Sequence, residues 1–515
     1  MHADHEEPLD ARPHHVGATA LTVVVELLGD AEIDPADHDR IASTLLTGIT
    51  LGSQSVEPGD LYAALPGAKT HGARFAADAV GAGAAAILTD AAGAARSRAT
   101  GVPVVVVADP RERLGAVASA LYGHPSERVV TIGVTGTQGK TTSTYLAESG
   151  LRGAGTTPAV VGTIGTRIDG RPVSSVLTTP EAPQLHALFA VMLEQGVGSC
   201  AMEVSSHAIV KGRIDGVVFD VAVFLNLGRD HLDFHVDLDD YFDAKARLFQ
   251  PEHARRAVIN VDDEHGRELL GRTHLPVTTF STEGRSADWQ AHDLDPDPLG
   301  TSLRVEGPGD QSVDLRVPLT GAFNVSNALA VMVALVTAGY DARLVADGIG
   351  ACRGVPGRME RIDAGQNFTA FVDYAHKPDA VEAILEAARP ITIGRVVLVI
   401  GAGGDRDAGK RPLMGQVAAR LADVVIVTDD NPRTEPPGLI RAEVVAGAGE
   451  GTAEIVEVDG RRAAIEHAVR LAGLGDCVIV AGKGHERGQE IDGVVHPFDD
   501  REVLREAILK TGATR

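Results

Sequence analysis

The run G-T-Q-G-K-T-T at positions 136–142 constrains the fold of this chain more than any other feature. It follows the apolar segment VVTIGV (129–134), which predicts a buried strand, and it leads into TTSTYLAESGL, which predicts a helix. Glycines at such a junction let backbone N–H groups turn toward phosphate oxygens, and the helix N-terminus adds a favourable dipole. Lys140 would neutralise the β and γ phosphates, and the Thr141 hydroxyl would ligate Mg²⁺. The run therefore predicts a site for a nucleoside triphosphate.

The loop departs from the strict pattern at one position. The form G-x-x-x-x-G-K-[ST] has glycine where Val134 stands, and the glycines available nearby are Gly133 and Gly136. A glycine-rich turn between strand and helix that happens to contain a lysine is therefore an alternative. The strand, the glycines, the lysine and the paired threonines together favour the phosphate site.

The rest of the chain predicts an α/β protein of three domains. Its 515 residues exceed one domain of about 100–150 residues. Short Val/Ile runs alternate with alanine-rich helical stretches, which is typical of parallel sheets covered on both faces. Polar residues end the last group of strands, as in doubly wound sheets that bind ligands there. We expect a flexible tail at 1–18, a small α/β domain at 19–126, a central P-loop domain at 127–356 and a Rossmann-like domain at 357–515.

The pattern also predicts individual strands. We expect an alternating strand after the Pro-Gly turn in SVEPGDLYAALPG. Further strands are expected at 200–204, 221–227, 257–263, 368–374, 395–401, 423–430 and 476–482, with hairpins between about 280 and 320.

Composition and charge exclude several classes of protein. A formal net charge of −24 argues against a nucleic-acid binder, because proteins bind phosphate backbones with clusters of Lys and Arg. No apolar run approaches the ~20 residues that a membrane span needs. The polar, acidic N-terminus does not have the pattern of a secretory signal. Three distant cysteines, Cys200, Cys352 and Cys477, are expected to be buried reduced thiols. We therefore expect a cytoplasmic protein.

Further side chains are candidates for metal chemistry, although the residues alone leave their roles open. Glu203 ends the apolar strand CAMEV, and Mg²⁺ on a nucleotide takes one or two carboxylates. Taken by itself, Glu203 is equally well a cap or a surface residue. His231 in NLGRDHLDFH and Lys245 in YFDAKARLF, taken by themselves, are better explained as helix-surface residues.

Eleven segments in order resemble the Mur ligase family, the ATP-dependent enzymes that add amino acids during peptidoglycan synthesis. They are TGTQGKTT, LTTPEAP, MEVSSH, NLGRDHLDFH, the AK of YFDAK, GAFNVSNALA, GRME, VDYAHKPDA, GAGGDRDAGKRPLM, DDNPRTE and AGKGHE. The resemblance covers nearly the whole chain.

The resemblance implies one reaction within this family. The D-N-P-R element is similar to that of the branch that uses meso-2,6-diaminopimelate rather than L-lysine. Arg433 supports the distinction, because a guanidinium is a bidentate partner for the distal carboxylate that lysine does not have. The implied activity joins diaminopimelate to the D-glutamate of UDP-N-acetylmuramoyl-L-alanyl-D-glutamate through an acyl phosphate. ATP is the co-substrate, Mg²⁺ the cofactor, and a monomer is expected.

The resemblance also implies roles for individual residues. The loop Gly136, Thr137, Gln138, Gly139, Lys140, Thr141 and Thr142 would bind ATP, together with Asn324, Arg358, Asp373 and His376. Catalysis would depend on Lys140, Glu203, His231 and Lys245. Magnesium would be held by Thr141, Glu203, His231 and Lys245, the last as a carbamate. The UDP-dipeptide would contact Leu51, Ser53, Thr178, Thr179, Ser205, Lys211 and Arg213. Diaminopimelate would contact Arg406, Asp430, Asn431, Pro432, Arg433, Gly482 and Glu486.

Some positions depart from the family pattern, and other functions compete. Gln138 stands where Asn or Ser is usual, and Gly52 and Gln54 flank Ser53 where Asp and Arg are usual. Leu225 and Gly228 replace a threonine and a serine. The same reaction with L-lysine, a folylpolyglutamate synthase-like ligase and a nucleotide-dependent switch protein are the alternatives. The switch would explain the phosphate loop but not DDNPRTE or AGKGHE.

Overall fold

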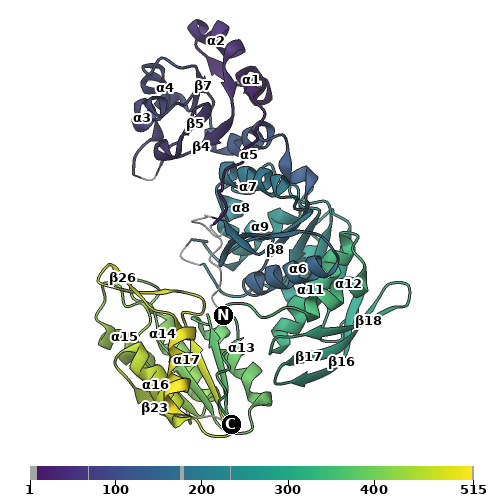
Figure 1. Cartoon of the computed structure of the whole chain (residues 1–515), viewed down its shortest axis with the longest axis vertical. Coiled ribbons are helices and arrows are strands. Elements are labelled where there is room, and N and C mark those ends of the chain that lie inside the picture. The colour runs from purple at the N-terminus through teal and green to yellow at the C-terminus, as the bar shows by residue number, and fades with distance from the viewer. Residues whose placement is uncertain (1–7, 68, 174–178, 232–233, 513–515) are drawn as a thin grey trace. The chain divides into compact units, whose positions relative to one another are not determined.

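The computed structural model describes residues 8–67, 69–173, 179–231 and 234–512. They form two compact units. The first contains the described residues up to Ala291, with Val305–Val313 and Leu329–Ile349; the second contains His292–Arg304, Asp314–Ala328 and the described residues from Gly350. Within the described residues, the main sheets have five, eleven and six strands, so the chain is the expected α/β protein (Figure 1).

The N-terminal sheet has the strand order β2-β7-β6-β5-β4. Its strands are β2 (Glu32–Ile33), β4 (Gly48–Thr50), β5 (Asp60–Ala64), β6 (Ala86–Thr89) and β7 (Val104–Val106), and all but β2 run parallel. The helices are α1 (Leu21–Leu28), α2 (His38–Ser43), α3 (Ala76–Gly81), α4 (Ala91–Arg98) and α5 (Pro110–Leu121). The alternating character expected of β5 is wrong, because all five of its residues are buried, and Leu61 and Ala63 pack in one apolar cluster while Tyr62 and Ala64 pack in another. A parallel strand covered on both faces shows no polar side.

The described part of the expected N-terminal tail contacts this sheet. The Arg12 guanidinium donates to Asp60 at 2.9 Å, and Asp60 is a fully buried carboxylate at the start of β5. The backbone N–H groups of His14 and His15 donate to Glu194. Leu9 is also bonded, through its N–H to the Pro172 carbonyl at 2.9 Å, and Arg12 supplies the cationic partner that a buried carboxylate needs. The boundary of the tail at 18 stays a prediction.

The central sheet has the order β11-β10-β9-β12-β8-β13-β14-β15-β16-β17-β18. Strand β8 (Val130–Thr135) lies between β12 (Ser199–Glu203) and β13 (Val221–Phe224), and all three are parallel. The other strands are β9 (Pro158–Gly162), β10 (Gly165–Ile168), β11 (Arg171–Val173), β14 (Ala257–Asn260), β15 (Val277–Ser281), β16 (Trp289–Asp297), β17 (Gly300–Gly307) and β18 (Gln311–Val317). The hairpins expected near 280–320 are β16 to β18, which Figure 1 shows side by side.

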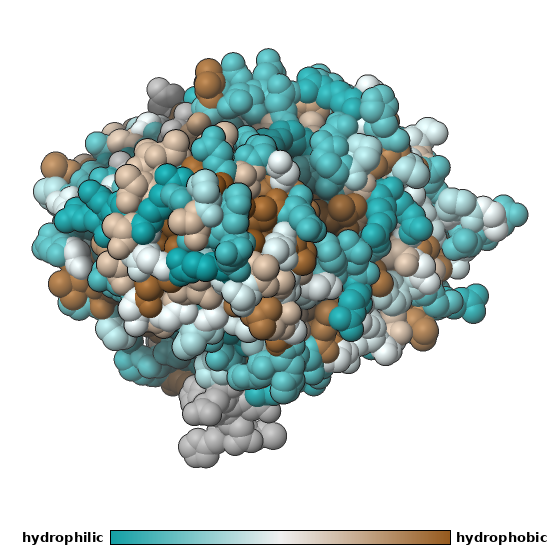
Figure 2. Space-filling view, turned by 90° about the horizontal axis from the view of Figure 1, so that it is seen from above, coloured by the Kyte–Doolittle hydropathy of each residue, from teal (hydrophilic) through white to brown (hydrophobic). Residues whose placement is uncertain are grey.

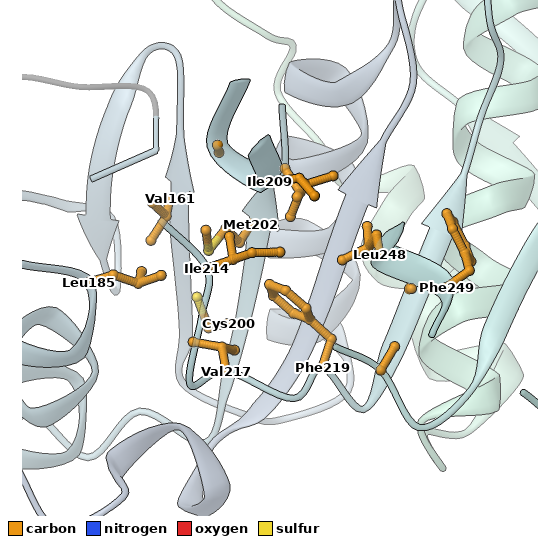
Figure 3. Packing of buried hydrophobic residues seen from close by; sticks show 14 of the residues in the cluster. Val161, Leu185, Cys200, Met202, Ile209, Ile214, Val217, Phe219, Leu248 and Phe249 are labelled. Atoms are coloured by element: carbon orange, nitrogen blue, oxygen red, sulfur yellow. The ribbon is translucent and has the colours of Figure 1, made fainter. Parts of the chain in front are cut away.

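Helices accompany this sheet. They are α6 (Lys140–Gly153), α7 (Ala182–Glu194), α8 (Ser206–Val210), α9 (Leu238–Ala246), α10 (Glu264–Leu270), α11 (Ala322–Thr337) and α12 (Ala342–Gly350). Figure 3 shows the apolar cluster on one face of the sheet, where Cys200 and Met202 of β12 meet Leu185 of α7 and Phe219. Burial in this cluster raises the pKa of the Cys200 thiol to about 12. Cys200 and Cys477 are buried free thiols as expected, and Cys352 is half-buried.

The sheet of the second unit has the order β19-β20-β24-β21-β22-β23 and is parallel apart from β19. Its strands are β19 (Glu360–Arg361), β20 (Thr369–Asp373), β21 (Val396–Ile400), β22 (Val424–Val427), β23 (Glu454–Glu457) and β24 (Cys477–Ala481). A hairpin of β25 (Gly488–Ile491) and β26 (Val494–Pro497) follows. The helices are α13 (Pro378–Ala388), α14 (Lys410–Leu421), α15 (Pro437–Gly447), α16 (Arg461–Leu471) and α17 (Asp500–Thr511).

Strand β21 shows why this sheet is doubly wound. Val396, Leu398 and Ile400 pack against α13, α14 and α15, whereas Val397 and Val399 pack against α16 and α17. Because both faces are buried, the strand is apolar throughout, and polar residues come only where strands end.

Figure 2 shows a mainly hydrophilic outer face with hydrophobic residues scattered through it. Among the described residues, no helix is long and apolar enough to span a membrane.

A buried histidine in α7 makes stability depend on pH. Burial lowers the pKa of His186 to about 4, although its Nε2 lies 3.0 Å from the Asp215 carbonyl oxygen, which opposes the shift. The unfolded chain binds this proton near the ordinary pKa of about 6.5, so acid favours unfolding as the pH falls from there toward 4. We expect acidification from pH 7.5 to 5.8 to cost the first unit about 1 kcal/mol through His186.

Urea unfolding at the two pH values tests this expectation. His186→Gln keeps a donor for the Asp215 carbonyl but cannot titrate, so it should lose less stability on acidification than the native protein. His274→Gln, at an exposed histidine, is the matched control and should lose as much as the native protein. An equal loss in His186→Gln would contradict the prediction.

Candidate nucleotide and amino-acid sites

The phosphate loop lies where the sequence predicted it, between β8 and α6. Asn226, which follows β13, holds its backbone: the N–H groups of Thr137 and Gln138 donate to the Asn226 Oδ1 at 3.1 and 2.9 Å. The loop also passes close to the end of β13 at Gly136, where a Cβ would lie 3.0 Å from the Cβ of Leu225, so this position favours glycine. The loop is thus a strand–turn–helix junction at the carboxyl edge of a parallel sheet, the arrangement that binds phosphate groups.

The Lys140 side chain folds over this loop. Its Nζ donates to the carbonyl oxygens of Gly136 and Thr137 at 2.7 and 3.0 Å. Thr141 and Thr142 follow in the first turn of α6 and are buried. Gln138 is exposed, so its replacement of the usual residue leaves the buried contacts of the loop unchanged. A lysine and a helix N-terminus therefore lie at the same turn.

Lys245 is buried beside the same turn. It is in the last turn of α9, only 1% of it is exposed, and its Nζ donates to the Gly136 carbonyl at 3.0 Å. The Nζ also lies 4.5 Å from the centre of the Tyr241 ring. The interpretation as a helix-surface lysine is wrong, because one face of α9 packs on the sheet. Lys140 and Lys245 share one carbonyl oxygen, which brings the half-buried amine of Lys140 close to the buried amine of Lys245.

Glu203 is neither a cap nor a surface residue. It ends β12, is 1% exposed, and accepts hydrogen bonds from the Thr163 N–H at 2.8 Å and the Thr163 hydroxyl at 3.0 Å. Two neutral donors hold the carboxylate in place without supplying a positive charge. Thr163 lies in the turn directly after β9. No sequence motif includes it, so sequence reasoning missed it.

His231 lies in the loop before α9, so its interpretation as a helix residue is also wrong. It has φ of 53°, its Nε2 lies 3.4 Å from Asp230, and its ring centre is 4.8 Å from that of His207. Among the described residues, no group of three or more His, Cys, Asp or Glu could hold a metal by itself. The predicted magnesium ligands include only two such residues, Glu203 and His231, and the ion would depend on hydroxyl and phosphate oxygens for the rest, as Mg²⁺ commonly does.

The residues predicted for the UDP-dipeptide divide between two sheets of the first unit. Leu51 and Ser53 follow β4 of the N-terminal sheet. Thr179 and Arg213 lie together beside the central sheet: the Thr179 hydroxyl donates to the Glu203 carbonyl at 3.2 Å, and Arg213 donates to the Thr179 carbonyl at 3.5 Å. Ser205 caps α8 through the N–H of Ala208. Lys211 ends that helix, and its Nζ lies 5.6 Å from the Phe234 ring. Thr178 lies outside the described residues.

In the second unit, Asp373 ends β20 and organises the polar turn after it. Its carboxylate accepts hydrogen bonds from the N–H groups of Met359 and Ala375 at 2.6 and 2.7 Å. Burial raises the pKa of Asp373, and the charge of Arg358 opposes the shift. Burial lowers the pKa of His376 to about 4, so this imidazole is neutral at pH 7. Arg358 lies 4.6 Å from the centre of the Tyr374 ring.

Asn324, also predicted for ATP, uses its amide to bond the Thr320 carbonyl at 2.8 Å.

Most of the residues predicted for the amino acid meet beyond β22 and β24. The Asn431 amide donates to Glu486 at 3.0 Å. Arg433 has φ of 51°, and it donates to Glu490 at 3.1 Å and to the Gly404 carbonyl at 2.6 Å. These bonds use two of the five N–H donors of a guanidinium. Pro432 is buried and Arg406 exposed. A Cβ at Gly482 would lie 2.5 Å from Asp430, so this approach requires glycine.

Sequence reasoning missed three side chains of this cluster. Lys483 and Arg461 are fully buried within it, and Glu490 pairs with Arg433. Lys483 stands inside the motif AGKGHE, which was the available signal. Arg461 opens α16, and no local pattern distinguishes it from a surface arginine.

Comparison with known families decides the classification of the chain. Three family models match it: "Mur ligase family, catalytic domain" over residues 45–122, "Mur ligase middle domain" over 134–335 and "Mur ligase, glutamate ligase domain" over 357–484. The chain belongs to the Mur ligase family. Mur ligases are ATP-dependent enzymes, and the phosphate loop described above lies in the middle domain of this one.

Similar proteins extend over the whole length of this Mur ligase. The UDP-N-acetylmuramoyl-L-alanyl-D-glutamate--2,6-diaminopimelate ligase of Streptomyces avermitilis is 53% identical over 98% of this chain and 99% of its own. The protein of the same name from Corynebacterium glutamicum is 49% identical over 94% of this chain and 95% of its own. A solved structure with this enzyme name is 33% identical, with a TM-score of 0.70 over 97% of this chain and 100% of that one. Folylpolyglutamate synthase of Mycobacterium tuberculosis, at 19% identity and a TM-score of 0.59 over 79% of this chain and 96% of its own, shares the fold alone.

Proposed function

We propose that this chain is an ATP-dependent ligase that adds meso-2,6-diaminopimelate to the D-glutamate of UDP-N-acetylmuramoyl-L-alanyl-D-glutamate. The observation that carries the proposal is the 53% identity over nearly the full length to a ligase of that name. The cluster around Asn431, Arg433 and Glu486 supports it, since this cluster offers both cationic and anionic partners to a zwitterionic substrate. The reaction belongs to the synthesis of peptidoglycan precursors, and we propose that it takes place in the cytoplasm on a monomeric enzyme.

The chemistry proceeds in two steps. A D-glutamate carboxylate oxygen attacks the γ-phosphorus of ATP, and the bond to ADP breaks, which leaves an acyl phosphate. The amine of the diamino acid then attacks the acyl carbon and loses a proton. Inorganic phosphate leaves with the former carboxylate oxygen of D-glutamate. Both steps bring anions together, so positioning and charge neutralisation provide most of the catalysis. Lys140 and the N–H groups of the loop would supply positive charge to the phosphates.

Magnesium is part of the same proposal. Glu203 fits such an ion, because it is a buried carboxylate held by two neutral donors at the carboxyl end of β12. Thr141, Glu203, His231 and Lys245 as a carbamate would hold it. When bound, the ion would neutralise charge on the phosphate oxygens. The ATP contacts of Asn324, Arg358, Asp373 and His376 and the contacts to the UDP-dipeptide stay predictions.

Amino-acid choice tests the proposed substrate. We expect diaminopimelate to be preferred over L-lysine by about two decades in kcat/KM. The reason is that a site built for a charged group rejects an analogue without it, since its own donors are left unpaired. The measurement is ATP-dependent phosphate release and product formation with the UDP-dipeptide and each of diaminopimelate, L-lysine and L-ornithine. Equal use of lysine would remove the assignment to diaminopimelate.

Two control reactions separate the proposal from its alternatives. Glutamate addition to a folate acceptor would indicate a folylpolyglutamate synthase-like ligase. Phosphate release that is independent of any amino acid would indicate a nucleotide switch. We expect neither with the native protein.

A further inference from the structure

Lys483 is a fully buried lysine in the turn after β24. A lysine normally keeps its ammonium group in water, and burying one is costly unless anionic and hydrogen-bonding partners surround it. Its Nζ donates to the Asn431 Oδ1 at 2.9 Å and to the Glu486 Oε2 at 2.9 Å. Both partners are residues predicted to contact the amino acid, and Lys483 itself has no role in the proposed function.

The Lys483 ammonium determines how Asn431 is oriented. An asparagine amide has one accepting and one donating end, and neighbouring groups decide which way it points. The Asn431 oxygen accepts from Lys483 and from the Glu490 N–H at 3.0 Å, and both groups can only donate. The Asn431 nitrogen is thereby turned toward Glu486, to which it donates at 3.0 Å. Glu486 Oε2 thus receives two donors from within the protein and is held in one position.

One carboxylate oxygen near Lys483 has no donor among the described residues. Arg461 forms a bidentate pair with Asp500 at 2.7 and 2.6 Å, and both side chains are fully buried. Its Nη1 is 3.9 Å from the Asp430 Oδ2, which is buried and has no hydrogen-bond partner among the described residues. The Asp430 Oδ2 is thus an acceptor that the described residues do not use, and it lies in the same cluster as Glu486. These two carboxylates suit an ammonium group on the ligand.

We propose that Lys483 is a positioning residue for the amino-acid substrate, holding Asn431 and Glu486 in the arrangement that receives the substrate's amino group. This inference rests on the proposed function and adds to it a residue that acts through others. If Lys483 lost its charge, the half-buried Glu486 would be left without its cation and Asn431 without one of the two donors that orient it. Either change weakens the site for the amino acid and leaves the phosphate loop of the first unit unchanged.

Lys483→Met in the full-length protein tests the inference, because methionine is similar in length but uncharged. We expect the KM for diaminopimelate to rise at least about tenfold, in line with the loss of a charged hydrogen bond in a buried site. The value of kcat and the KM values for ATP and the UDP-dipeptide should stay within about threefold of the native enzyme. Lys510→Met is the matched control: this lysine pairs with Glu466 in the same unit but is 63% exposed, and its loss should change none of the constants.

A second variant covers the case in which Lys483→Met does not fold. Lys483→Gln keeps a donor group for Asn431 without the charge, and we expect the same selective rise in the KM for diaminopimelate. Three outcomes would overturn the inference. They are an unchanged KM for diaminopimelate in a folded variant, an equal rise in the KM of all three substrates, and failure of both variants to fold. The native enzyme is assayed first: if it does not use diaminopimelate, the proposed function fails, whereas native use with unaltered variants removes only the role of Lys483.

Discussion

Lys140→Ala is expected to lower kcat by about two to three decades while the protein stays folded. The Lys140 ammonium lies on the phosphate loop, where it bonds two carbonyl oxygens and stands at the N-terminus of α6. Positive groups placed where charge develops in the transition state are typically worth 10²–10³ in rate. The side chain is only partly buried, so its truncation leaves the apolar core unchanged. ATP turnover with all substrates, alongside circular dichroism, measures both parts of the expectation.

The control for Lys140→Ala is the same change at an exposed lysine. Lys510→Ala removes an equal charge from α17 and should leave kcat unchanged. If Lys140→Ala kept more than about a tenth of the native activity, the role assigned to the loop would have to be given up.

Lys245→Ala is expected to lower kcat at least as much as Lys140→Ala does. Added acetate or formate should restore part of the lost activity. Lys245 is 1% exposed and shares the Gly136 carbonyl with Lys140. Two ammonium groups about 4–6 Å apart repel by roughly 3–4 kcal/mol at an effective dielectric constant of about 20. A carbamate on Lys245 would replace this repulsion by attraction and would supply oxygen ligands for Mg²⁺. A small carboxylate could occupy the space that alanine leaves.

Lys245→Arg distinguishes the carbamate from an ordinary cation. Arginine keeps the positive charge, fills the space and cannot form the carbamate, so we expect no turnover and no rescue. Carbon-13 NMR after exposure to labelled bicarbonate should show a carbamate signal in the native protein that is missing from this variant. Near-normal turnover of Lys245→Arg would show that an ordinary cation is enough.

Local sequence patterns were sufficient for most of the fold. The strands expected at 368–374, 395–401 and 476–482 are β20, β21 and β24, each one residue shorter at both ends. The strand expected at 221–227 ends earlier, at Phe224, because Asn226 leaves the ladder to bind the phosphate loop. Strand β23 was not expected: Glu454–Glu457 has glutamate at both ends and lies at the edge of its sheet, so its sequence does not have the apolar character of a covered strand.

The amino-acid sequence by itself determined the phosphate loop, because a strand, a glycine turn and a helix start are properties of neighbouring residues. It also determined the alternation of covered strands and helices that makes an α/β protein. Only the tertiary structure decided which charged side chains are buried. The local sequence does not show that Glu203, Lys245 and Lys483 are buried, and each is buried by segments distant along the chain. Burial of a charge depends on which donors, acceptors and opposite charges the fold brings to it, and residue spacing does not contain that information.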